Sequence, residues 1–273
     1  IVRVVGRARA TAVGILRKAG RFWALCPEGV PDDAGMEVLG FAKGVEPRSG
    51  VLAALKIERW PTEQRGPGGT VTEILGKPEE PAARRKAVLA ARDIPTVFPE
   101  DALEEADALP LDPTEADWGG RRVLFDIPIF TIDGADAKDF DDAVSLETQP
   151  LGRWRLGVHI ASVADYVKRD TPLDTEAVRR GTRVYLPGRV IPRLPPRLCD
   201  HLCSFRPDVP RLTLTCWLEL DAQGAPGRVD LEETVIRSWR RFTYEEVQDV
   251  LDGKTVERVL PAVQESVLSM GAL

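Results

Sequence analysis

The chain has 273 residues, of which 43% are hydrophobic, so it exceeds the usual size of one domain and can bury a sizeable core. It has no run of 18 apolar residues and no signal-peptide-like opening segment. The sequence therefore predicts neither a membrane-spanning nor a secreted protein, and it favours the cytoplasm. The formal net charge of −6 would argue against a nucleic-acid partner only if the charge were spread evenly along the chain.

The charge is instead segregated. Residues 100–117 contain eight acids and no Lys or Arg, whereas residues 177–211 contain eight arginines and two acids. We expect the acidic run to form a solvated face, because eight unpartnered like charges would repel one another if buried. The arginines suit contact with phosphate groups.

The first 76 residues have the pattern of a small β-rich domain. Short apolar and β-branched runs, separated by Gly and Pro, predict strands at residues 1–5, 11–16, 22–25, 36–39, 51–57 and 70–75. This pattern favours an OB-fold-like barrel, and eleven basic against eight acidic residues leave the segment near +3. Phe22 and Trp23 either stack nucleic-acid bases or fill the barrel interior.

Residues 77–120 form a connector in this interpretation, with a helix at residues 82–92 followed by the acidic run. We assign no chemistry to it. The domain division predicted is thus residues 1–76, a connector at 77–120, and a second domain at 121–273.

The second domain opens on the densest motif of the chain. A predicted buried strand at residues 123–130 leads into ten residues with five aspartates, from Asp133 to Asp142. Two carboxylates about 4 Å apart repel by roughly 4 kcal/mol, so a converging set would take up protons or hold a cation. Oxygen ligands favour Mg²⁺, Mn²⁺ or Ca²⁺. The spacing of Gly and Glu does not fit an EF-hand, while an acidic surface turn stays the alternative.

The rest of the domain mixes strands and helices without regular alternation, so the fold class predicted is α+β. Strands are expected at residues 154–160, 212–221 and 229–238, the last two as a hairpin. A helix is expected at 172–181 and another from Tyr244 onward, where Thr243 and Glu246 form a candidate capping box. Residues 182–197 contain too many prolines for regular structure.

Several motifs in this order resemble the ribonuclease II / ribonuclease R exoribonuclease family. The aspartate motif comes first, with Asp133, Asp139 and the pair Asp141-Asp142 at the family's spacing. The likeness continues through residues 156–161, 181–187, 190–195, 202–204, 218–220, 235–238 and 242–247. It covers residue 123 to the end with few gaps, and residues 13–14 and 69–76 look like the cold-shock-type domain of the same family.

The resemblance implies an N-terminal OB-fold-like barrel followed by a mixed α/β RNB-type catalytic domain. It implies that Asp133, Asp139, Asp141 and Asp142 hold Mg²⁺, with Mn²⁺ as a substitute, and that they are catalytic. Tyr185 would stack near the 3′-terminal nucleotide. Arg183 and Arg189, in the arginine-rich segment, are the expected substrate contacts. Asp136 lies outside the family pattern, and Ser162 stands where the family usually has an aspartate.

The activity implied is a processive 3′-to-5′ exoribonuclease that hydrolyses single-stranded RNA to 5′-mononucleotides. Metal-assisted hydrolysis also agrees with the residues, since His159 and His201 are the only histidines and neither lies in a nucleophile motif. We expect a monomer. The family's remaining catalytic half and its S1-type domain are absent from these 273 residues, so the rival hypothesis is a non-catalytic RNA-binding module or an inactive fragment.

A zinc site is the alternative at Cys199, His201 and Cys203, whose side chains could all bind this metal. The segment lacks a separated second pair of ligands. Cys203 also falls where the family has an ordinary cysteine.

Overall fold

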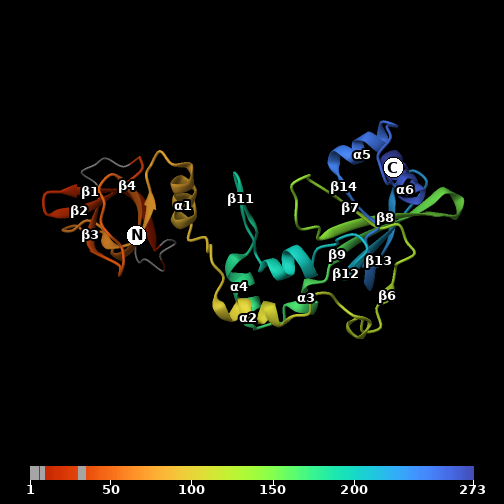
Figure 1. Ribbon diagram of the computed structural model, residues 1–273, viewed down its shortest axis with the longest axis horizontal. Coiled ribbons are helices and arrows are strands. Elements are labelled where there is room, and N and C mark those ends of the chain that lie inside the picture. The colour runs from red at the N-terminus through yellow and green to blue at the C-terminus, as the bar shows by residue number, and fades with distance from the viewer. Residues whose placement is uncertain (1–5, 7–9, 30–34) are drawn as a thin grey trace. The chain divides into compact units, whose positions relative to one another are not determined.

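The computed structural model describes residues 6, 10–29 and 35–273, which form two compact units (Figure 1). Unit 1 comprises Ile1–Val97 and Tyr185–Ile191, and unit 2 comprises Phe98–Val184 and Pro192–Leu273. The predicted domain boundaries at residues 76 and 120 stay predictions. Within the described residues, no helix is both long and apolar enough to cross a membrane.

Unit 1 contains a closed five-stranded barrel, which confirms the predicted OB-like fold. Its strands are β1 (Thr11–Ala19), β2 (Phe22–Pro27), β3 (Met36–Phe41), β4 (Val51–Arg59) and β5 (Gly68–Gly76), joined in the order β1-β2-β3-β5-β4. Leu16, Leu25 and Leu55 are fully buried in its core. The strand predicted at residues 1–5 lies outside the described residues.

Helix α1 (Pro81–Ala91) follows the barrel and confirms the helix predicted there; Pro81 begins it, a position where the missing N–H costs nothing. Apart from Val184, unit 1 also includes a hairpin of β10 (Val184–Leu186) and β11 (Arg189–Ile191). The prediction of no regular structure at residues 182–197 is therefore wrong. Pro187 and Gly188, whose φ is +70°, lie between the two strands, so the same residues that argued against strands make the turn.

Unit 2 is built on a seven-stranded sheet of order β14-β7-β8-β9-β12-β13-β6. The inner strands are antiparallel, and the edge strands β14 and β6 pair in parallel with their neighbours. The strands are β6 (Arg122–Val123), β7 (Phe130–Asp133), β8 (Asp142–Gln149), β9 (Arg153–Ala161), β12 (Pro210–Leu220), β13 (Pro226–Arg237) and β14 (Arg240–Thr243). This mixed sheet with helices confirms the α+β class.

Helices cover the two faces of this sheet unequally. On one face lies the larger core, which includes residues of α2 (Glu100–Ala108), α3 (Val163–Tyr166), α4 (Pro172–Arg180) and the π-helical turn η4 (Arg197–Leu202). On the other, α5 (Tyr244–Leu251) and α6 (Pro261–Ala272) enclose a smaller core around Phe130 and Phe242. Short 3₁₀ turns occur at Glu115–Asp117 (η2) and Pro150–Gly152 (η3).

One predicted strand of unit 2 is wrong. Residues 123–130 form only the end of β6 and the start of β7, with a turn in which the Ile127 amide donates to the Leu124 carbonyl (3.4 Å). Pro128 has no N–H to donate to a neighbouring strand, which explains why the segment does not form one continuous strand. Leu124 and Ile129 are nevertheless buried. The apolar residues of this segment therefore indicated that it is buried, but not that it forms a strand.

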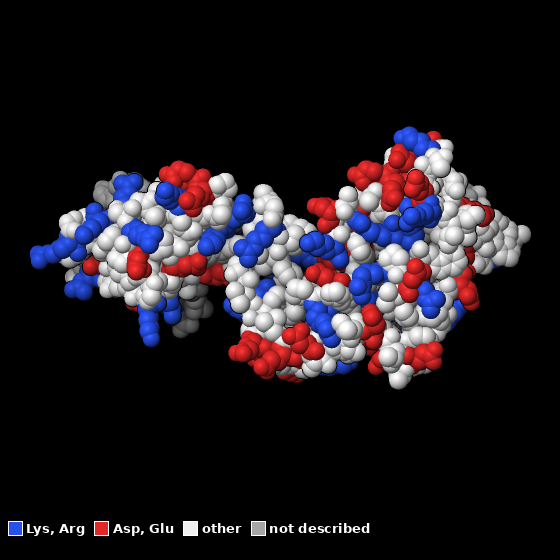
Figure 2. Space-filling model, viewed as in Figure 1, with Lys and Arg blue, Asp and Glu red and all other residues white. Residues whose placement is uncertain are grey.

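The acidic run at residues 100–117 contains a helix. Helix α2 begins with Glu100 and Asp101, where carboxylates favour the positive end of the helix dipole. Ala102 and Ala106 face the core, whereas the eight acids of residues 100–117 are exposed except for the half-buried Glu105. Acidic side chains gather over α2 in Figure 2, as expected for a solvated face.

Candidate active site

The aspartate loop joins β7 to β8. Asp133 ends β7, Asp142 begins β8, and Asp139 and Asp141 lie in the connecting loop. The amide of Ala161 on β9 donates to the Asp141 carbonyl (3.0 Å), so the return of the loop is held to the sheet. The loop is therefore attached at both ends to core strands and is not an unsupported surface turn.

Three of the four predicted carboxylates interact with one another. Burial raises the pKa of Asp133, and the nearby charges of Asp142 and Asp141 raise it further. Partial burial also raises the pKa of Asp141, to which the charge of Asp142 contributes. The Asp133 Oδ2 atom is buried and has no hydrogen-bond partner. The surrounding groups therefore compensate the negative charges of these three carboxylates only in part.

Asp139 is placed differently from these three. Its carboxylate forms an ion pair with the guanidinium of Arg183, and both side chains are about one-fifth exposed. Arg183, predicted to contact substrate, is therefore engaged with a carboxylate of the loop. Across the described residues, no three His, Cys, Asp or Glu side chains are grouped so that they could hold a metal ion.

Asp133, Asp141 and Asp142 have the donor chemistry of a divalent-cation site, although in this structure their side chains are not grouped closely enough to hold one ion together. Carboxylate oxygens are the ligands that Mg²⁺ and Mn²⁺ prefer, and the unpartnered Asp133 Oδ2 is a vacant acceptor among repelling charges. Asp139 would be available only after exchange of its Arg183 partner.

Two residues that sequence reasoning missed hold this loop. Arg241 on β14 donates through Nη2 to the carbonyls of Gly134 (2.7 Å) and Ala135 (3.0 Å). Its guanidinium also lies 4.8 Å from the centroid of the Phe140 ring. Ser204 accepts a hydrogen bond from the Phe140 amide through Oγ (3.2 Å). Both residues act on backbone and ring atoms, and no motif spacing signals such contacts.

The two remaining predicted contacts lie on the β10–β11 hairpin of unit 1. Tyr185 is 70% exposed on β10, and Arg189 is exposed on β11. Phe22 and Trp23, the candidate stacking residues of the barrel, differ in their exposure to solvent. Phe22 is 63% exposed, while Trp23 packs against the barrel core and meets Phe41 edge to face at 5.8 Å.

The candidate zinc ligands are mostly buried. Burial raises the pKa of both Cys199 and Cys203 to about 12, which keeps them protonated. The Cys199 thiol contacts the Leu194 carbonyl (3.6 Å) and the Asp200 carboxylate (3.2 Å). Both cysteines thus have the environment of core thiols.

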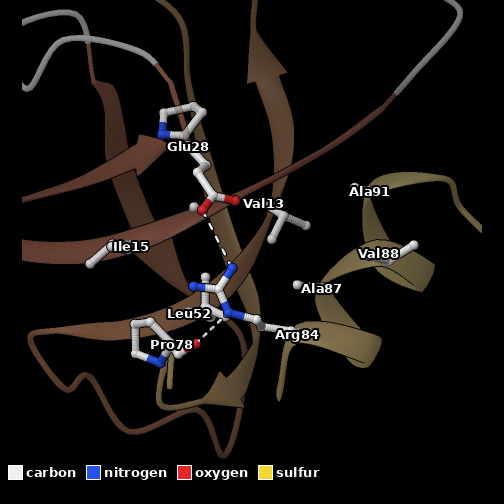
Figure 3. Close-up of a pocket in the computed structure, with 11 residues that line it drawn as sticks. Val13, Ile15, Glu28, Leu52, Pro78, Arg84, Ala87, Val88 and Ala91 are labelled. Atoms are coloured by element: carbon white, nitrogen blue, oxygen red, sulfur yellow. Dashed lines mark hydrogen bonds and ion pairs between the residues drawn. The ribbon is translucent and has the colours of Figure 1, made fainter. Parts of the chain in front are cut away.

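Unit 1 has a cavity of about 430 Å³ between the barrel and α1 (Figure 3). Its walls are largely apolar, with Val13 and Leu52 from the barrel and Val88 from the helix. Arg84 supplies the polar side, where Nε donates to the Pro78 carbonyl (2.7 Å) and Nη1 pairs with Glu28 (3.4 Å). The predicted contacts Phe22, Tyr185 and Arg189 are not among its lining residues.

The chain matches two families of known proteins. A family described as "RNB domain" matches residues 121–273, and one described as "Cold shock domain" matches residues 30–99. Ribonuclease R of Thermotoga maritima is 39% identical over 259 residues, which are 92% of this chain and 36% of that protein.

Two solved structures give the same picture. Mycoplasma genitalium RNase R in complex with double-stranded RNA superposes with a TM-score of 0.85 at 26% identity, over 98% of this chain and 47% of that one. Yeast Ssd1, described as a pseudonuclease, superposes with a TM-score of 0.77 at 21% identity, over 99% of this chain and 35% of that one. The second likeness bears on the fold alone. The chain spans roughly a third to a half of these relatives.

Proposed function

The chain belongs to the RNB-domain family, and from this premise we propose that it is part of a 3′-to-5′ exoribonuclease whose centre is the aspartate loop. The observation that carries the proposal is the crowding of Asp133, Asp141 and Asp142 on a loop held by core strands. We propose Mg²⁺ as the cofactor, with Mn²⁺ able to replace it, and single-stranded RNA as the substrate.

Each residue of the site has a task in this proposal. Asp133, Asp141 and Asp142 would hold the cation, and Asp139 would join them once its pairing with Arg183 is exchanged. Bound divalent cations supply charge neutralisation at the phosphate, an activated water and stabilisation of the leaving 3′-oxygen. Arg241 and Ser204 keep the loop backbone in place, so that the carboxylates do not spread apart as their charges repel.

RNA contacts outside the loop come from exposed rings and guanidinium groups. We propose that Phe22 and Tyr185 stack on bases, since a base stacked on an aromatic ring contributes about 1–3 kcal/mol. Arg189 would contact phosphate. Processive release of 5′-mononucleotides is the mode we propose, by analogy with the family.

A non-catalytic RNA-binding module is the second candidate. It is favoured by the Arg183–Asp139 ion pair, which occupies one of the four carboxylates. Such a module would bind RNA through unit 1 without cleaving it.

The two candidates are separated by incubating the protein with 5′-labelled single-stranded RNA, with Mg²⁺ or with EDTA. We expect a ladder that shortens from the 3′ end and is abolished by EDTA and by Asp141→Asn. Asp136→Asn is the matched control, because Asp136 lies in the same loop but outside the family pattern, and it should leave the ladder unchanged. Binding without cleavage in every lane would favour the non-catalytic module. Equal loss of activity in the two variants would contradict the assignment of Asp141.

A further inference from the structure

One of the four predicted cation ligands is occupied by an ion pair within the protein. The Asp139 carboxylate pairs with the Arg183 guanidinium, and both side chains are largely buried, 21% exposed for Asp139 and 23% for Arg183. Water screens exposed ion pairs so strongly that they contribute little, whereas a pair largely removed from water is screened much less. Neither charge is therefore fully available to another ligand until this pair opens.

The loop backbone next to Asp139 is fixed by hydrogen bonds on both sides of Phe140. The Phe140 amide donates to Ser204 Oγ (3.2 Å), and the Phe140 carbonyl accepts from the Phe205 amide (2.7 Å). Asp139 can thus leave Arg183 by rotation about its own side-chain bonds, without movement of the neighbouring backbone.

The other three carboxylates do not complete a cation site by themselves. The charges of Asp141 and Asp142 act on Asp133, and that of Asp142 acts on Asp141. Even so, the part of the chain that the structure describes has no three acidic, His or Cys side chains placed to hold one ion. A cation at this loop therefore requires its ligands to rearrange, and Asp139 is the carboxylate whose freedom to move depends on an identified contact.

The two partners of the ion pair suit opposite ligands. A carboxylate is a ligand for Mg²⁺ or Mn²⁺, whereas a guanidinium binds phosphate through two parallel hydrogen bonds. While the pair is closed, Asp139 is withheld from the cation and Arg183 is withheld from the phosphate. One opening step makes both of them available.

We propose that the Arg183–Asp139 pair is a latch that couples the binding of RNA to the binding of the cation. An RNA phosphate that binds Arg183 releases Asp139 for the cation, and a cation that binds Asp139 releases Arg183 for the phosphate. Each ligand therefore tightens the binding of the other by the same factor, as thermodynamic linkage requires. The latch rests on the proposed function, because both ligands have to meet at the aspartate loop.

The first arm of the test measures Mn²⁺ binding without RNA, by electron paramagnetic resonance of the free ion. Arg183→Gln removes the competitor for Asp139, so Mn²⁺ should bind about tenfold more tightly than to the unsubstituted chain. Lys138→Gln is the matched control, since it removes the same charge from an exposed side chain next to Asp139 and should change the affinity less than threefold. In an Asp139→Asn background, Arg183→Gln should have no more effect than this control.

The second arm measures the binding of fluorescently labelled single-stranded RNA in EDTA, where no cation binds and no cleavage occurs. Asp139→Asn frees Arg183, so RNA should bind about tenfold more tightly. The slope of log affinity against log salt should steepen by about 0.7, as for one further phosphate contact on a single strand. Asp136→Asn removes an exposed carboxylate of the same loop and, as the matched control, should tighten binding less than threefold. In an Arg183→Gln background the gain from Asp139→Asn should disappear.

The outcomes separate the latch from the proposed function. If Arg183→Gln binds Mn²⁺ no more tightly than Lys138→Gln does, net charge alone explains the change and the latch is overturned. The same holds if Asp139→Asn binds RNA no more tightly than Asp136→Asn does. Circular dichroism of each variant establishes that it is folded. Absence of Mn²⁺ uptake by every protein, Arg183→Gln included, would contradict the cation centre and the latch together.

Discussion

His159 lies in a chain of hydroxyl groups inside the larger core of unit 2. Its Nε2 is 3.0 Å from the Ser145 hydroxyl, and its Nδ1 is 2.8 Å from that of Thr215. Thr215 Oγ1 in turn is 2.6 Å from Thr234 Oγ1, which is 2.5 Å from Thr213 Oγ1. All five side chains are fully buried, so the network satisfies polar groups that would otherwise cost about 1–3 kcal/mol each.

This environment predicts a pH dependence of stability. Burial lowers the pKa of His159 to about 3, against about 6.5 in an unfolded chain. Between these values the unfolded chain binds a proton that the folded chain does not, so the free energy of unfolding rises with pH. The contribution is complete above about pH 6.5 and is lost as the pH falls towards 3.

Urea unfolding at pH 7 and pH 5 measures the effect. We expect His159 to lower the free energy of unfolding by about 2 kcal/mol at pH 5 relative to pH 7. His159→Gln should reduce this difference, whereas His201→Gln keeps His159 and should retain it. An unchanged difference in His159→Gln would show that other groups cause it.

The hydrogen-bond network leaves no room for a side chain at Gly157. A Cβ atom there would come within 2.5 Å of Ser145 Oγ and 2.8 Å of both His159 Nε2 and the Trp217 ring. We expect Gly157→Ala to lower the free energy of unfolding by about 1–3 kcal/mol, through overpacking of a buried site. Gly227→Ala, on β13 with its nearest atom at 3.4 Å, should change it much less, and thermal unfolding compares the two. Equal effects would contradict this account of Gly157.

At the scale of single residues, the sequence located the aspartates but not their supports. The density of carboxylates after an apolar segment drew attention to residues 133–142, and the resemblance to the family then selected Asp133, Asp139, Asp141 and Asp142 among them. The contacts of Arg241 and Ser204 depend on β14 pairing with β7 and on η4 approaching the loop. Such tertiary neighbours have no local pattern.

Helix α5 shows how much a local signal can predict. Thr243 Oγ1 accepts from the Glu246 amide (3.1 Å), and the Glu246 carboxylate accepts from the Thr243 amide (2.8 Å), which confirms the predicted capping box. Both partners lie within four residues, so the motif could be predicted from sequence. Thr243 also pairs with Asp133 in the β14–β7 register, which places the start of α5 beside the aspartate loop.

Thr243→Ala should therefore destabilise α5 and the strand pairing next to it. We expect a loss of about 1 kcal/mol in the free energy of unfolding, the usual cost of removing an N-cap hydroxyl. Thr243→Ser retains the hydroxyl and should recover most of the loss in the same denaturation assay. A serine variant as unstable as the alanine variant would exclude capping as the cause.

Elements that sequence reasoning mistook share a physical cause. Apolar content predicted a strand at residues 123–130, and proline content predicted irregular structure at 182–197. In the first case Pro128 interrupts a buried segment, and in the second Pro187 and Gly188 make a hairpin turn. Whether a proline ends an element or turns it depends on the pairing of its neighbours, which composition does not report.

At the scale of the whole molecule, strand periodicity and turn residues predicted the barrel, and the mixture of strands and helices predicted the α+β unit. The order of the seven strands in unit 2 was not predictable from the sequence. Its two parallel edge pairs join segments more than 100 residues apart, Arg122 with Thr234 and Phe130 with Arg240. No local signal specifies such pairs.

Direct binding of Mn²⁺ tests, without requiring catalysis, whether the aspartate loop is a divalent-cation site. Titration of the protein with Mn²⁺, followed by electron paramagnetic resonance of the free ion, gives the affinity. We expect uptake by the unsubstituted chain, unchanged uptake by Asp136→Asn, and at least tenfold weaker uptake by Asp133→Asn, which replaces the carboxylate of the unpartnered Oδ2. Equal affinities in all three proteins, or no uptake by the unsubstituted chain, would contradict the account.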